Sequence, residues 1–169
     1  RSPNIMWGSS HMIETLVNAI ARFRQDLTFD HELVLADVSR RRGGKFPPHK
    51  SHQAGRDVDI WMPTIKGVYQ PSHIREGKER KPFPEETDWF ALYGFTKALG
   101  ETGSVEAIFL DESLHDRVYN AAQLMGADQE ELEEMISRHP DGSRHPNALI
   151  THSPGHTRHF HVRFKCGPN

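Results

Sequence analysis

The spacing of apolar residues predicts several short helices. Apolar side chains recur every three or four positions over residues 11–25, which is the helical period, and Ser9 or Ser10 is a candidate N-cap. A second helix is expected from Asp88, a good N-cap residue, to the glycine at position 100. Residues 113–125 and 128–139 give two more, and the last of these carries acidic residues in its first turn, where the helix dipole favours them.

Short segments rich in valine, leucine and isoleucine predict strands between these helices. The expected strands are residues 32–39, 57–62 and 104–111, followed by a strand, a tight Pro-Gly connection and a final strand within residues 148–164. The short connection beside the final strand predicts antiparallel pairing. We therefore expect an α+β fold, with a small antiparallel sheet flanked by helices and long loops. Residues 1–169 are expected to form a single domain.

Composition narrows the possible functions. The 169-residue chain is 36% hydrophobic and has a formal net charge of -2, so nucleic acid is not an expected partner. No apolar run approaches the ~20 residues of a membrane-spanning helix. Cys166 is the single cysteine of these 169 residues, so we expect neither a disulfide between two of them nor a cysteine-based zinc site among them. Residues 63–87 are polar and proline-rich, and a connection of this length is usually a functional rim or disordered.

The final strand, residues 158–164, is the most informative stretch. Side chains alternate across a strand, which places His159, His161 and Arg163 on one face and Phe160, Val162 and Phe164 on the other. The apolar face can enter a core while two imidazoles project together from the opposite face. A His-x-His pair of this kind can hold a metal ion and a catalytic base together.

A second segment supplies partners for this pair. His52 is followed seven residues later by Asp59, on a predicted strand whose alternation also puts Asp57 on the same face. Two histidines and one carboxylate can bind zinc and leave a fourth position open, which is the pattern of a catalytic site. From the strand pattern alone, Asp57 and Asp59 are both candidate ligands.

The segments SHQAGRDVDIW and PGHTRHFHVRF together resemble the penicillin-insensitive murein endopeptidases, within the wider group of lysostaphin-type peptidases, D-Ala-D-Ala metallopeptidases and hedgehog domains. The resemblance implies a hydrolase of peptidoglycan cross-links that is periplasmic or otherwise exported. It implies Zn²⁺ bound by His52, Asp59 and His161, and favours Asp59 over Asp57 as the ligand. It further implies that His159 and His156 act in catalysis and that His49 precedes the first ligand. With Asp59 as the ligand, we expect Asp57 either to orient a ligand histidine through a hydrogen bond or to pair with Arg56.

The chemistry of amide hydrolysis agrees with this set. The reaction needs a polarised carbonyl, an activated water and a proton for the leaving amine, and zinc supplies the first two. His159 shares a strand face with His161, so it can take a proton as imidazole or stabilise charge and donate a proton as imidazolium. The alternatives are a D,D-carboxypeptidase or dipeptidase of the same metal-site group, or a zinc-holding binding domain without catalysis. Of the other histidines, His152 is expected to be structural rather than catalytic, and the rest are expected at the surface: His11, His31, His73, His115, His139 and His145.

Overall fold

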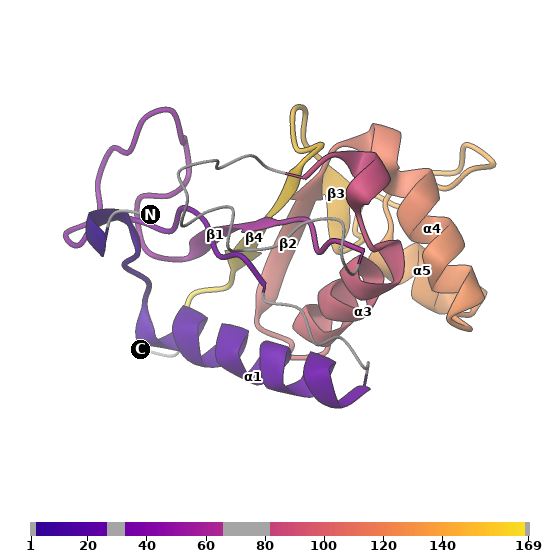
Figure 1. The fold of residues 1–169 in the computed structure, drawn as a ribbon, viewed down its shortest axis with the longest axis horizontal. Coiled ribbons are helices and arrows are strands. Elements are labelled where there is room, and N and C mark those ends of the chain that lie inside the picture. Colours follow the sequence, from indigo (N-terminus) through magenta and orange to yellow (C-terminus); the bar gives the residue numbers. More distant parts are fainter. Residues whose placement is uncertain (1–2, 27–32, 66–81, 168–169) are drawn as a thin grey trace.

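The computed structural model describes residues 3–26, 33–65 and 82–167, and these ranges form the helices and strands shown in Figure 1. The α-helices are α1 (Ser10–Asp26), α3 (Trp89–Gly100), α4 (His115–Leu124) and α5 (Gln129–Met135). The strands are β1 (Asp57–Trp61), β2 (Val105–Leu110), β3 (Ile150–His152) and β4 (His159–Phe164). Short 3-10 helices lie at Pro3–Ile5, Pro84–Glu86 and Glu112–Leu114. The expected α+β class is confirmed.

Three helices begin where polar side chains satisfy their first backbone amides. Ser9 Oγ accepts from the Met12 amide at 3.2 Å, which selects Ser9 over Ser10 as the cap of α1. Asp88 caps α3 by accepting from the Ala91 amide at 3.0 Å. Asp128 caps α5 in the same way. Local capping chemistry therefore fixes where these helices start.

The sheet is mixed rather than wholly antiparallel, with strand order β1-β4-β2-β3. Strand β4 pairs antiparallel with β1 and with β2, as expected, but β3 pairs parallel with β2. The expected direct pairing of the last two strands is therefore wrong, because β2 lies between them. The chain leaves β2, passes through α4 and α5 and returns as β3 in the same direction, which is how a helical crossover produces a parallel pair.

The strand expected at residues 32–39 is replaced by an extended segment with isolated bridges. Glu32 lies outside the described residues, and residues 33–39 bridge only at Leu35 and Ser39. The segment nevertheless runs along the outer edge of β1, where the Ala36 amide donates to Asp59 O at 2.8 Å and the Asp59 amide donates to Asp37 O at 2.9 Å. It thereby covers an edge that would otherwise present unpaired backbone groups.

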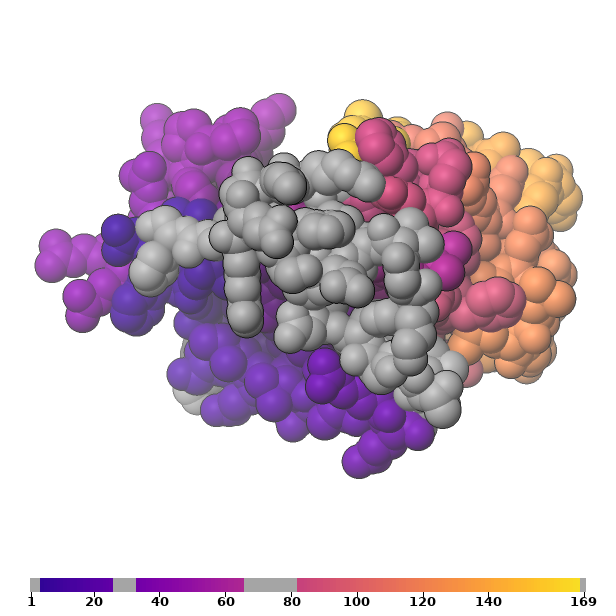
Figure 2. Space-filling model, in the orientation of Figure 1, coloured from indigo at the N-terminus to yellow at the C-terminus, as the bar shows by residue number. Residues whose placement is uncertain are grey.

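One face of the sheet packs against helices and the other carries polar residues. Phe160, Val162 and Phe164 of β4 are fully buried in the main hydrophobic cluster with side chains of α1 and α3. In Figure 1, α1 runs below the strands, and α3, α4 and α5 lie at the right of the view. In Figure 2 the indigo and violet N-terminal part of the chain lies at the left and bottom, and the orange part, which includes α4 and α5, lies at the right. The alternation of β4 predicted this placement of its aromatic side chains.

Two of the histidines expected at the surface are buried. His115 is 0% exposed and His139 is 1% exposed, and the ring of His139 stacks on that of His145. These two expectations were wrong. Both histidines lie in polar stretches of sequence, which favours exposure, but the packing around α4 and α5 buries their rings. His31 and His73, and most of the polar stretch 63–87, lie outside the described residues. Within the described ranges, no helix has the length and apolar character needed to cross a membrane.

Candidate metal centre and active site

Three side chains on the polar face direct one atom each at a common point. Strands β1 and β4 pair with Asp59 opposite His161, and His52 reaches them from the loop before β1. His52 Nε2 lies 3.1 Å from His161 Nδ1, and each of these nitrogens lies 3.2 Å from Asp59 Oδ1. All three residues are at most 5% exposed. Ligand atoms around tetrahedral zinc, with bonds of about 2.0–2.1 Å, stand roughly 3.3 Å apart, so the spacing fits a metal ion.

The ring nitrogens of His52 and His161 that point away from the common point are hydrogen-bonded to other groups. The two nitrogens that point toward it therefore present lone pairs. His52 Nδ1 donates to the Val38 carbonyl at 2.7 Å, and His161 Nε2 donates to Asp57 Oδ1 at 2.8 Å. Because a neutral imidazole carries one proton, His52 Nε2 and His161 Nδ1 are then acceptors. Asp59 Oδ1 is buried and has no hydrogen-bond partner among the described residues. Three buried acceptors in mutual contact suit a cation, and outer hydrogen bonds of this kind orient metal-binding histidines.

The charge states of the centre also suit a cation. Burial alone would raise the pKa of Asp59, but in the metal-free chain the adjacent imidazoles of His161 and His52, when they carry a second proton, outweigh burial and hold the pKa far below its ordinary value. Asp59 is therefore a carboxylate at neutral pH. Burial would lower the pKa of His161, yet Asp57 and Asp59 raise it in the metal-free chain. A metal ion that binds here must displace the proton from His161, so metal binding should weaken as the pH falls.

His49 lies beside the centre rather than behind it. Its Nε2 is 3.0 Å from Asp37 Oδ2, its Nδ1 is 3.6 Å from Asp59 Oδ2, and its ring lies 4.3 Å from that of His52. One ligand atom from each of His49, His52 and Asp59 also falls within 4.8 Å of the others, so this overlapping set is a second possible metal-binding group. The set with His161 is tighter, because its three ligand atoms lie 3.1–3.2 Å from one another.

His159 and His156 form a second pair of imidazoles beside the centre. Their ring centroids are 4.8 Å apart, and His159 Nε2 lies 3.9 Å from Asp59 Oδ2. His156 sits in the connection between β3 and β4, which Asp111 anchors by accepting from the Gly155 amide at 3.0 Å. Burial is the main cause that lowers the pKa of the His156 imidazole. Two imidazoles thus stand beside the candidate ligands, where either can exchange a proton with a bound molecule.

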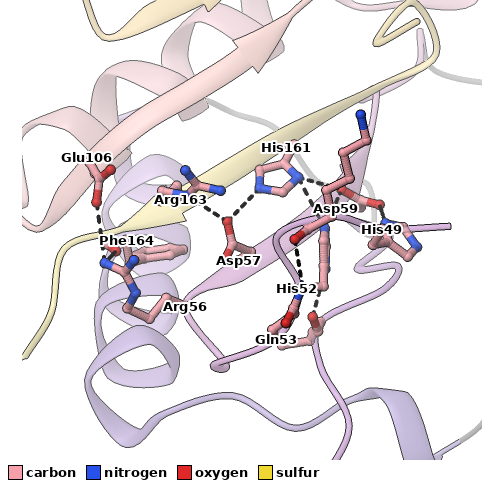
Figure 3. A network of polar contacts seen from close by, with 12 residues as sticks. His49, His52, Gln53, Arg56, Asp57, Asp59, Glu106, His161, Arg163 and Phe164 are labelled. Atoms are coloured by element: carbon pink, nitrogen blue, oxygen red, sulfur yellow. Dashed lines mark hydrogen bonds and ion pairs between the residues drawn. The ribbon is translucent and has the colours of Figure 1, made fainter. Parts of the chain in front are cut away.

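The structure brings the sequence-predicted site residues together around one cavity of about 500 Å³. Its walls include the predicted residues His49, His52, Asp59, His156, His159 and His161. Asp57 lies behind His161, where it binds that ring and Arg163 (Figure 3).

Sequence reasoning missed several side chains of the site, and two of them show why. One is Asp37, which holds His49, and the other is Phe109 of β2, whose ring meets His161 edge-on at 5.3 Å. No local pattern marks either residue, because each reaches the site only through strand pairing.

The three arginines of the motif segments occupy different places. Arg56 binds Glu106 and the Phe164 carbonyl, away from His161 in Figure 3. Arg158 donates to the Pro82 carbonyl and lies over the Phe83 ring. Arg163 lines the cavity beside His161. Only one of the three is therefore placed to meet a molecule bound at the centre.

The fold and site define an α+β chain with a histidine–aspartate group able to hold a metal ion. Residues 1–87 match the sequence model of the penicillin-insensitive murein endopeptidase family, which is just over half of the 169 residues, and the chain belongs to this family of peptidases. The family description names murein, the bacterial peptidoglycan, as the substrate. No curated protein matches the chain. The matched range includes His52 and Asp59 but not His161, which the fold brings to them.

Proposed function

We propose that the protein is a zinc-dependent endopeptidase that hydrolyses the peptide cross-links of bacterial peptidoglycan, of the D-Ala–diaminopimelate type. The main support is the convergence of His52 Nε2, Asp59 Oδ1 and His161 Nδ1 within 3.2 Å of one another, in a chain of the murein endopeptidase family. Because peptidoglycan lies outside the cytoplasmic membrane, the proposal places the protein in the periplasm or another exported location.

His52, Asp59 and His161 would hold the metal ion. Zinc, when bound at such a site, polarises a carbonyl and lowers the pKa of a water molecule. The Val38 carbonyl and Asp57 hold the two imidazoles in the tautomers that present a lone pair. Phe109 packs against the His161 ring and removes one side of it from water. These contacts fix the ligands before substrate arrives, which lowers the cost of binding.

His159 is proposed to carry out proton transfer, with His156 assisting. The His159 ring is 13% exposed and its Nε2 lies 3.9 Å from Asp59 Oδ2, so it reaches the cavity beside the ligand group. From this position it can accept a proton from water at one stage and donate one to the leaving amine at another. No glutamate lines the cavity among the described residues, so we assign proton transfer to His159 and His156 rather than to a glutamate.

The second candidate function is a D,D-carboxypeptidase or dipeptidase, and Arg163 is the observation that favours it. A carboxypeptidase grips a free C-terminal carboxylate, for which arginine is well suited, and Arg163 lines the cavity. A non-catalytic zinc-binding domain is the third reading, but it has no chemical use for the His156–His159 pair.

The test offers purified cross-linked muropeptide dimer and free pentapeptide stem in separate reactions, each with and without a chelator, and identifies the products by mass spectrometry. The endopeptidase is expected to convert dimer to monomers only without chelator, and to leave the pentapeptide intact. Release of D-Ala from the pentapeptide with the dimer untouched would assign the carboxypeptidase. If zinc-loaded protein cleaves neither substrate, the remaining interpretation is a non-catalytic zinc-binding domain.

A further inference from the structure

Arg163 is held at a fixed place next to the candidate metal ligands. It follows His161 by two residues on the same face of β4, a spacing of about 7 Å along a strand. Its Nε donates to Asp57 Oδ1 at 2.9 Å, and the same oxygen accepts from His161 Nε2 at 2.8 Å. The guanidinium also lies 5.4 Å from the centre of the Phe109 ring. Arg163 and the ligand His161 are thus joined through one buried carboxylate.

The terminal nitrogens of Arg163 remain available to a ligand. A guanidinium has five N–H donors, and the hydrogen bond to Asp57 uses the one on Nε. Within the described residues, no other hydrogen bond or ion pair of Arg163 is found, and its side chain is 27% exposed on the cavity wall. Two parallel N–H groups on the terminal nitrogens match the two oxygens of a carboxylate.

Two cationic side chains of the cavity wall could meet an anion, while the carboxylate in the wall, Asp59, belongs to the candidate ligand group. Lys50 and Arg163 are the cationic side chains other than histidine that line the cavity among the described residues. Lys50 is exposed on the loop before His52, whereas Arg163 is anchored by Asp57. A carboxylate on the substrate would therefore find one prepositioned partner, and preorganisation of that partner lowers the entropic cost of binding.

The proposed substrate carries such a carboxylate at the right separation. Diaminopimelate forms its cross-link through an amine whose carbon also bears a carboxyl group, so this carboxylate is two bonds from the scissile nitrogen. From standard bond lengths, the scissile and carboxylate carbons are about 3–4 Å apart. The Cα atoms of His161 and Arg163 are about 7 Å apart, but both side chains reach the same Asp57 oxygen. With the scissile carbonyl near His161, the Arg163 guanidinium is therefore within hydrogen-bond reach of the substrate carboxylate. A cross-link through a lysine side-chain amine has no carboxylate there.

We propose that Arg163 binds the substrate carboxylate next to the scissile amide nitrogen and so selects cross-links that carry it. The inference rests on the proposed peptidase function and adds the residue that recognises the leaving half of the substrate. It also explains why a cavity-lining arginine is compatible with an endopeptidase, because the cross-link supplies its own carboxylate beside the cut bond.

The experiment compares two synthetic cross-linked dimers that differ only at this group, which is a free carboxylate in one and a carboxamide in the other. The unmodified protein should cleave the acid with a kcat/KM about 10–100-fold higher, the scale of a hydrogen-bonded charge pair. In Arg163→Gln this preference should fall to within about threefold, mainly through a slower reaction of the acid. Arg163→Lys should recover part of it. Arg56→Gln is the matched control, since Arg56 lies in the same sheet region but binds Glu106, and it should keep the full preference.

Two further measurements separate this role from a structural one. Zinc content and thermal midpoint are recorded for every variant, and calorimetry on chelator-treated protein compares binding of the acid and carboxamide forms of the amine-side product. Equal cleavage of both dimers by the unmodified protein, or an equal loss on both in Arg163→Gln, would overturn the proposal. If neither dimer is cleaved, the peptidase proposal fails, and the calorimetry still decides whether Arg163 distinguishes acid from carboxamide.

Discussion

Replacement of Asp57 by asparagine tests how the candidate metal centre is held. Asp57 is 2% exposed, and one of its oxygens accepts from both His161 and Arg163. Burial would raise the pKa of this carboxyl, but the hydrogen bonds from His161 and Arg163 outweigh it and keep the pKa below its ordinary value. Asparagine has nearly the same shape, so Asp57→Asn removes the charge without creating a large void.

The magnitude follows from the two hydrogen bonds. A hydrogen bond to a charged group contributes about 1.5–3 kcal/mol and a neutral one about 0.5–1.5 kcal/mol. Loss of charge at Asp57 should therefore cost the metal-free protein roughly 2–3 kcal/mol of unfolding free energy. Loss of an outer-shell partner typically weakens metal binding by about 10–100-fold, because the ligand ring becomes less basic and less well oriented.

The assay is competition for zinc with a chromophoric chelator at fixed pH, with urea unfolding of the metal-free protein in parallel. Asp59→Asn is the matched comparison, because Asp59 lies two residues away on the same strand and its Oδ1 belongs to the ligand group. We expect Asp59→Asn to weaken zinc binding at least about tenfold more than Asp57→Asn, since a three-ligand site that loses a ligand rarely keeps its metal. The reverse ranking, or an unchanged zinc affinity in Asp57→Asn, would refute the assignment.

The remaining predictions concern catalysis and acid stability. His159→Ala should keep zinc and lose turnover by roughly 10²–10⁴-fold, the usual scale for a positioned acid or base, with a milder loss in His156→Ala; release of zinc would contradict the assigned role. His115 is fully buried, and burial lowers its pKa. The imidazole of His115 is therefore protonated less readily in the folded chain than in the unfolded chain. Its contribution to stability is complete above the unfolded pKa of about 6.5. That contribution should fall, by at most about 1.4 kcal/mol per pH unit, as pH drops from there toward the folded pKa. Urea unfolding between pH 7.5 and 5 should therefore show a smaller loss in His115→Leu than in the unmodified protein or a His11→Gln control; equal slopes would contradict this.

Local patterns in the sequence determined much of the site. The alternation in residues 158–164 separated the imidazoles of His159 and His161 from the buried aromatic residues, and the structure keeps that separation. The helix caps Asp88 and Asp128 likewise fixed where α3 and α5 begin. These features depend on neighbours within about four residues, which is the range over which side-chain alternation and capping act.

Only the tertiary structure decided which distant segments meet. His52 and His161 are 109 residues apart in the chain, and their nitrogens touch because β1 pairs with β4 in one register. The insertion of β2 between β3 and β4 brings Phe109 against His161, and the same folding encloses His115. It also separates Arg163 in the cavity from Arg56 and Arg158 outside it, although all three are arginines in the motif segments. Strand pairing and core packing depend on the whole chain, so the local spacing of residues could not have predicted which of the three arginines enters the cavity.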